Sequence, residues 1–96
     1  MSDVIAKAVD ALNQKLGGEG FDGSIKVDIA DEGCLIIDGN GAHAGDGDAD
    51  CTLSADAETF QGMLSGDVNP TSAFMTGGLT VDGDMGAAMK LGAVLS

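Results

Sequence analysis

The chain has no tryptophan, tyrosine or arginine, and its 96 residues include only one histidine and two cysteines. Only Phe21, Phe60 and Phe74 are aromatic, so the core must be built from aliphatic side chains and flexible methionines. Cys34 and Cys51 with a single histidine are too few for a disulfide scaffold or a zinc site. We therefore expect two free thiols, no metal centre and no cofactor.

Basic residues are also scarce, with four lysines against 16 acidic residues and a net charge of -12. Residues 27–89 contain no Lys or Arg. This charge excludes binding to a nucleic-acid backbone and opposes contact with an anionic membrane. Because 44% of the residues are apolar and the mean hydropathy is +0.16, we expect a folded chain, not a disordered acidic one. Its length predicts one domain over residues 1–96.

Long apolar runs are absent too, since no segment approaches the roughly 18 residues that a membrane span needs. The first residues lack the charged and then apolar layout of a signal peptide. We therefore expect a cytoplasmic protein without stable membrane insertion.

Hydrophobic periodicity predicts a helix followed by a hairpin in the first half of the chain. Apolar residues recur every three or four positions over residues 3–16, which is typical of a helix. Apolar and polar residues alternate over residues 25–29, and residues 34–37 form an apolar return strand. The glycine-rich and acidic residues 38–50 leave room for a short edge strand and a loop.

The second half predicts strand, helix, helix, strand and helix. Alternation at residues 49–53 indicates a strand, after which Ser54 is a candidate helix cap. Asn69 and Pro70 open a second helix, and residues 79–81 form a last strand. In the final helix we expect Asp84 as the cap and one apolar face, made of Met85, Ala88, Met89 and Leu95. This order predicts a mixed sheet covered by helices.

Candidate motifs for metal, nucleotide or catalytic chemistry fail on their spacing. Asp46-x-Asp48-x-Asp50 matches the start of a calcium loop, but Cys51 and Ala57 stand where that loop needs Gly and Glu. The glycines from Gly39 to Gly45 lack the spacing and the following helix of a dinucleotide site. The spacing of His43, Asp50 and Cys51 does not support a nucleophile with its base, and no activating basic residue lies near Cys51 in the sequence. We predict no catalytic residues and no enzyme activity.

A run of apolar and glycine residues in the second half resembles the sterol carrier protein type 2 family. The matching residues are Phe60-x-x-Met63-Leu64-x-Gly66 and then Asn69-Pro70-x-x-Ala73-Phe74-Met75-x-Gly77-x-Leu79-x-Val81-x-Gly83-Asp84-Met85-Gly86-x-Ala88-Met89-Lys90-Leu91. The resemblance implies an α+β fold: a five-stranded mixed β-sheet covered by α-helices on one face, enclosing an apolar cavity. It also implies non-enzymatic binding and transfer of a lipid, such as a sterol-like or fatty-acyl ligand.

The resemblance further implies which residues line the cavity, and the periodicity of the sequence predicts only that they are buried. These residues are Phe60, Met63, Leu64, Phe74, Met75, Leu79, Val81, Met85, Ala88 and Met89. With no Arg and four Lys in the chain, a neutral or weakly acidic lipid fits better than an acyl-CoA. The C-terminal Val94-Leu95-Ser96 replaces the Ser-Lys-Leu peroxisomal address of eukaryotic relatives, which favours a small, stand-alone, bacterial-type member.

A second interpretation is an accessory interaction or oligomerisation domain with a collapsed cavity. In that case the apolar face contacts a partner enzyme or a second copy of the chain, as a homodimer. Co-purified lipid distinguishes the carrier from a ligand-free oligomer.

Overall fold

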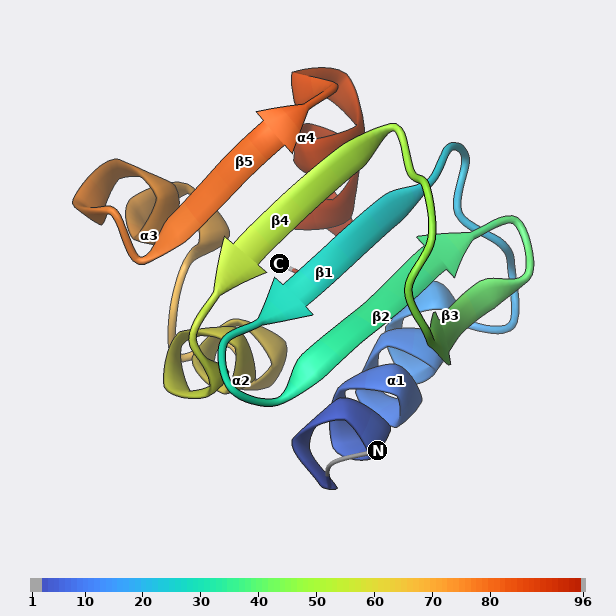
Figure 1. The fold of residues 1–96 in the computed structure, drawn as a ribbon, viewed down its shortest axis with the longest axis horizontal. Helices are drawn as coiled ribbons and strands as arrows, with labels where there is room; N and C mark the ends of the chain where they lie inside the picture. Colours follow the sequence, from blue (N-terminus) through green and yellow to red (C-terminus); the bar gives the residue numbers. More distant parts are fainter. Residues whose placement is uncertain (1–2, 96) are drawn as a thin grey trace.

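The computed structural model describes residues 3–95, except for the side chains of residues 70, 71 and 95. These residues form four helices and five strands, in the order that the periodicity predicts (Figure 1). Their bounds are α1 Asp3–Leu16, β1 Ile25–Ile29, β2 Gly33–Asp38, β3 Gly41–Ala44, β4 Cys51–Ala55, α2 Ala57–Ser65, α3 Pro70–Thr76, β5 Leu79–Gly83 and α4 Met85–Leu95.

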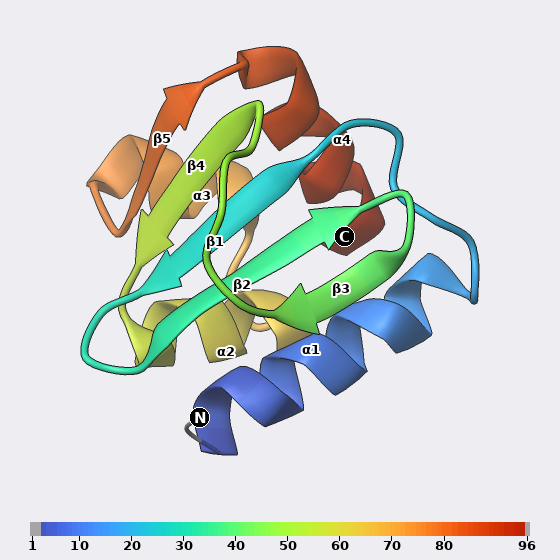
Figure 2. The ribbon, with the colours of Figure 1, turned by 45° about the vertical axis from the view of Figure 1, so that its right-hand side comes forward.

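The five strands form one mixed sheet in the order β3-β2-β1-β4-β5. The β1 and β4 strands are parallel, and the other neighbouring pairs are antiparallel. In Figure 1 the helices α1, α2 and α4 lie behind the sheet and α3 lies beside β5; Figure 2 shows the same layers from a second direction. This confirms the predicted α+β fold with a five-stranded mixed sheet and helices on one face.

The alternating pattern of β1 decides which face the helices cover. Ile25, Val27 and Ile29 are at most 1% exposed, whereas Lys26 and Asp28 lie on the opposite face. The buried side chains of β1 join one core cluster with residues from the helices, including Leu12 of α1, Phe60 and Met63 of α2 and Leu91 of α4. Burial of this apolar face is the main stabilising contribution to the fold.

The two cysteines cannot form an intrachain disulfide in this fold. Cys34 lies on β2 and Cys51 on β4, with β1 between them, and the two side chains lie on opposite faces of the sheet because they pair with Asp28 and Ile25. Two strand spacings are about 9.6 Å, beyond the reach of a disulfide. Both thiols are free, as predicted, although only Cys51 is fully buried. Loss of hydration raises the pKa of both thiols.

The connection from β3 to β4, residues 45–50, crosses the sheet face that the helices leave open (Figure 1). An ion pair between Lys26 of β1 and Asp46 holds this connection, and the Ser24 hydroxyl accepts a hydrogen bond of 2.9 Å from the Asp50 backbone N–H. A hydrogen bond and charge attraction from Lys26 lower the pKa of Asp46. Lys26 therefore offsets part of the acidic charge of this connection. The residues next to the connection in the sequence cannot do so, because none of them is Lys or Arg.

Ser54 and Asp84 were predicted as the N-terminal caps of α2 and α4. The prediction of Ser54 as a cap was wrong, because β4 continues through Ser54, which pairs with Asp28 and Thr80 in the sheet. The cap of α2 is Asp56, whose carboxylate accepts a 2.6 Å hydrogen bond from a backbone N–H in the first turn. The prediction for α4 is confirmed: Asp84 accepts a 2.9 Å hydrogen bond from the Gly86 backbone N–H.

Thermal stability is expected to rise with sodium chloride, because a net charge of -12 repels itself in a compact body. Two lysine–carboxylate pairs, Lys26–Asp46 and Lys90–Asp22, occur among the described residues. Raising the salt from about 0.1 M to about 1 M shortens the Debye length from about 10 Å to about 3 Å. Calorimetry should then show a midpoint that is several degrees higher. An unchanged or lower midpoint would mean that a bound divalent cation already compensates the acids.

Candidate functional site

Six of the ten predicted cavity residues lie in or against the hydrophobic core. Phe60, Met63 and Leu79 are at most 6% exposed and belong to the core cluster. Leu64, Val81 and Ala88 are half-buried and pack against it. These six come from α2, β5 and α4 and form the layer between the sheet and its helices. Their predicted burial is confirmed in full for the first three and in part for the others.

The other four predicted residues are exposed. Phe74 and Met75 of α3 are 44% and 80% exposed, and Met85 and Met89 of α4 are 47% and 73% exposed. The prediction that these side chains are buried was wrong. Among the described side chains, the large apolar ones that are exposed all lie on these two helices, which pack against each other. We call the four side chains the α3/α4 apolar surface.

Helix geometry explains why α4 exposes its methionines. Ala87 and Leu91 face the core and are 5% and 1% exposed. Because successive residues advance by about 100°, Met85 and Met89 lie about 160° to 200° round the helix from Ala87. A helix that is apolar on all sides is normally covered all round by other groups. The outer side of α4 therefore has the composition of a contact surface. The side chain of Leu95, predicted on the same face as Met89, lies outside the described residues.

The α3/α4 apolar surface carries little charge in a strongly charged chain. Residues 68–81 contain no charged side chain, and the α3, β5 and α4 elements together carry only Asp82 and Lys90. Phenylalanine and methionine supply apolar contact and adapt to different shapes. Such an arrangement is suited to binding an apolar molecule.

An ion pair joins α4 to the connection between α1 and β1. The Lys90 Nζ lies 3.1 Å from Asp22 Oδ2, in the connection between α1 and β1. Their side chains are 55% and 93% exposed. Lys90 follows Met89 directly in the sequence, and because successive helix residues advance by about 100°, its side chain lies on another side of α4. Sequence reasoning missed this pair, because 68 positions separate the two residues.

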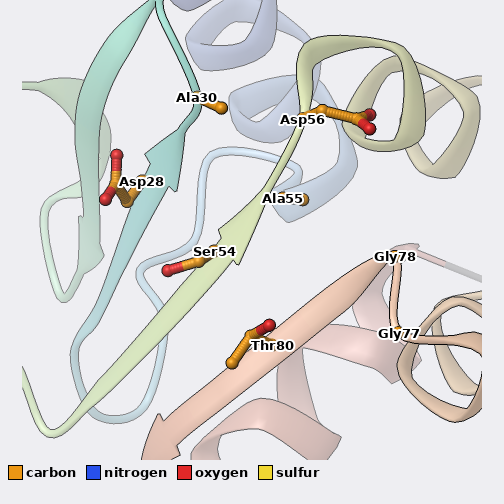
Figure 3. Close-up of a pocket in the computed structure, with 8 residues that line it drawn as sticks. All are labelled: Asp28, Ala30, Ser54, Ala55, Asp56, Gly77, Gly78 and Thr80. Carbon is orange, nitrogen blue, oxygen red and sulfur yellow. The ribbon is translucent and has the colours of Figure 1, made fainter.

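A polar pocket of about 320 Å³ lies on another part of the molecule, at the ends of β1 and β4 (Figure 3). Sheet register brings Asp28, Ser54 and Thr80 side by side across three strands. The other residues that line it are Ala30, Ala55, Asp56, Gly77 and Gly78. The pocket shares no residue with the ten predicted ones, and the Asp56 carboxylate is already engaged as the cap of α2. We assign no function to it.

Neither a metal site nor a membrane-spanning helix is found among the described residues. Within it, no cluster of three or more His, Cys, Asp or Glu side chains is placed to hold a metal ion. Within residues 3–95, no helix combines the length and hydropathy that a membrane span needs.

Similarity to a known protein family covers almost the whole chain. Residues 3–96 match the SCP-2 sterol transfer family. Hydroxysteroid dehydrogenase-like protein 2 of Bos taurus is 37% identical over 92 residues, which are 95% of this chain and 21% of that protein. Sterol carrier protein 2 of Homo sapiens is 46% identical over 43 residues, 45% of this chain and 8% of that protein. The chain thus spans about a fifth or less of these relatives.

Solved structures share the fold at low sequence identity. The sterol carrier protein-2 of Aedes aegypti in complex with palmitate, a C16 fatty acid, has a TM-score of 0.78 at 15% identity, covering 100% of this chain and 97% of that one. Sterol carrier protein 2 like 2 of Aedes aegypti has a TM-score of 0.77 at 17% identity, covering 95% of both chains. At these identities the likeness establishes the common fold.

Proposed function

Because the chain belongs to the SCP-2 sterol transfer family, we propose that it is a non-enzymatic lipid carrier that binds its ligand at the α3/α4 apolar surface. The observation that supports this site most directly is the exposure of Phe74, Met75, Met85 and Met89 on two adjoining helices. A lipid bound there removes these side chains from water. The palmitate complex of a protein with the same fold supports a fatty-acyl or similarly apolar ligand.

The binding energy comes from apolar burial. Each Å² of apolar surface removed from water contributes about 25 cal/mol, so a few hundred Å² yield several kcal/mol before the entropic cost of association. Met75 and Met89, at 80% and 73% exposure, have the most surface left to bury. Their flexible side chains suit ligands of more than one shape.

We further propose that the ligand becomes enclosed when α3 and α4 shift away from the sheet. The half-buried Leu64 of α2 and Val81 of β5 then line the inner wall, and α3 and α4 also turn, so that Ala88 and the now exposed side chains form the outer wall. Among the described side chains of α4, Ala87 and Leu91 are the buried ones, so this shift separates one large side chain, Leu91, from the core. Phe60 and Met63 remain in the core beneath. We place this carrier in the cytoplasm.

A second candidate function, an accessory interaction domain, rests on the same exposed side chains, since an apolar surface also suits a partner protein. Two features oppose a second copy of the chain as that partner. Two bodies of charge -12 repel each other. The edge strand β3 is also occupied: the Asn13 side chain of α1 accepts from the Ala42 N–H and donates to the Ala42 carbonyl, both at 2.9 Å.

Native mass spectrometry of the freshly purified chain, with lipid extraction, tests the carrier function. We expect a monomer with one lipid molecule, and a delipidated sample that takes up one long-chain alcohol or fatty acid per chain. A stable ligand-free oligomer that takes up neither would contradict the carrier function and support the interaction domain.

A further inference from the structure

The two edges of the sheet differ in whether their outward backbone groups are bonded. In an antiparallel pair, every second residue of an edge strand points its N–H and carbonyl away from the sheet. At β3, the hydrogen bond from the Gly45 N–H to the Cys34 carbonyl fixes this alternation, so that Ala42 points outward. The Asn13 side chain of α1 bonds both groups of Ala42 at 2.9 Å, as a neighbouring strand would. The β3 edge is thus closed.

The corresponding groups at the β5 edge are open. The Asp84 N–H donates to the Asp50 carbonyl at 2.9 Å, and this bond sets the alternation between β4 and β5. Thr80 and Asp82 therefore bond to β4, whereas Val81 points its N–H and carbonyl away from the sheet. Among the described residues, neither of these groups of Val81 has a hydrogen-bond partner, and no strand lies beyond β5 (Figures 1 and 2). Such an edge is a template for a further strand.

The side chains of β5 determine what kind of strand fits beside it. Val81 pairs with the buried Leu53 and faces the helices, but it is only half-buried at the edge of the sheet. Asp82 lies on the opposite face, is exposed, and belongs to neither of the two lysine–carboxylate pairs among the described residues. The strand contains no Lys or Pro that would discourage pairing. An added strand therefore places one side chain beside an apolar residue and the next beside a carboxylate.

We propose that the outer edge of β5 binds an extended segment of a partner protein in which apolar residues alternate with lysine or arginine. The segment is basic because the chain has a net charge of -12 and residues 27–89 contain no Lys or Arg. The same charge, with Asp82 on each copy, opposes a second copy of the chain at this edge. This inference goes beyond the carrier function and does not depend on it.

The test uses a fluorescein-labelled peptide of seven residues that alternates lysine and valine. Its binding to the full chain is followed by fluorescence anisotropy at about 50 mM salt, where charge screening is weak. A peptide that alternates glutamate and valine keeps the strand pattern and reverses the charge. The wild-type chain should bind the lysine peptide at least ten-fold more tightly than the glutamate peptide, because charge complementarity adds to the same backbone pairing.

Two charge variants separate local from global effects. Asp82→Lys replaces an attraction with a repulsion beside the peptide and should lower the affinity for the lysine peptide about five- to ten-fold. Asp10→Lys makes the same change at an exposed position of α1, which packs on β3 at the other edge of the sheet. It should lower the affinity less. Because both positions are exposed, thermal unfolding should be nearly the same in the two variants.

Amide exchange with solvent, measured by NMR, detects pairing at the edge itself. In the free chain the Val81 N–H should exchange much faster than the Ala42 N–H, which Asn13 holds. Saturation with the lysine peptide should slow the Val81 N–H at least ten-fold. Val81→Pro removes this N–H without removing a bond to β4, and it should abolish peptide binding. Circular dichroism checks the fold of this variant, and the exchange of the wild-type chain decides the inference without it.

The possible outcomes separate this inference from its alternatives. Equal binding of the two peptides, equal effects of Asp82→Lys and Asp10→Lys, or an unchanged Val81 exchange rate at saturation would each overturn it. Slower Val81 exchange at higher protein concentration without peptide would overturn it as well, and would assign the edge to a second copy of the chain. In all these cases the carrier function stands, because lipid uptake is measured separately.

Discussion

Replacing Met89 with Asp is expected to lower lipid affinity at least ten-fold while leaving the fold intact. Met89 is 73% exposed on α4, so the free chain tolerates a carboxylate there, with a change in unfolding free energy within about 0.5 kcal/mol. In the complex, the same carboxylate is covered by the ligand and loses its water without gaining a partner. Titration with a fluorescent long-chain alcohol measures the affinity, and chemical denaturation measures the stability.

Ala6→Asp is the matched control for this variant. Ala6 is an exposed position on α1 outside the α3/α4 apolar surface, and its substitution adds the same charge to the chain. Lipid affinity should stay close to wild type in this control. Equal affinities of the Met89→Asp and Ala6→Asp variants would show that the ligand does not contact the outer side of α4.

Replacing Phe60 with Ala is expected to lower the free energy of unfolding by about 3–5 kcal/mol. Phe60 is 0% exposed and packs in the cluster that joins α2 to the sheet and α1. Its removal loses the burial of the ring and leaves a cavity behind. The loss is a large part of the roughly 5–15 kcal/mol that stabilises a typical domain. Urea denaturation, followed by circular dichroism, measures the change.

Phe74→Ala provides the comparison for this prediction. The substitution is the same, but Phe74 is 44% exposed, so the destabilisation should stay near 1 kcal/mol or below. Lipid affinity should fall instead, because Phe74 belongs to the α3/α4 apolar surface. Similar stability losses for the two variants would mean that Phe60 is not the core residue described above.

The alternation of apolar and polar residues was sufficient to predict the sheet. Ile25, Val27 and Ile29 point to the core as expected, and β2 returns antiparallel after a turn. The resemblance, not the periodicity, supplied the count of five strands and the helices on one face. The boundary at Ser54 was wrong because Ser and Asp both favour helix caps. Only the pairing of Ser54 with Asp28 in the sheet shows that β4 continues through Ser54 and that Asp56 caps the helix.

Periodicity failed for the orientation of α4. Its apolar residues occur on every side of the helix, so the spacing of Met85 and Met89 was compatible with either the buried or the exposed face. Packing selected Ala87 and Leu91 for the core. When the apolar residues of a helix lie on all its sides, its tertiary contacts decide which side faces the core. As a result, Met85 and Met89 are exposed although their side chains are apolar.

The partners of the charged residues could not be predicted from the sequence either. The excess of acids was evident, but Asp22–Lys90 and Lys26–Asp46 each join residues far apart in the chain. Their partners depend on how the connections after α1 and β3 lie over the sheet and beside α4. These pairs therefore follow from the three-dimensional arrangement, whereas the expectation of an apolar ligand came from the family resemblance.

Methyl NMR of the methionines tests the central claim, lipid binding at the α3/α4 apolar surface, most directly. Met75, Met85 and Met89 lie on this surface, and the buried Met63 serves as an internal reference in the core. During titration of the delipidated chain with hexadecanol, the three surface methyl signals should shift most and saturate at one ligand per chain. Ligand uptake that leaves all three signals unchanged would contradict the account.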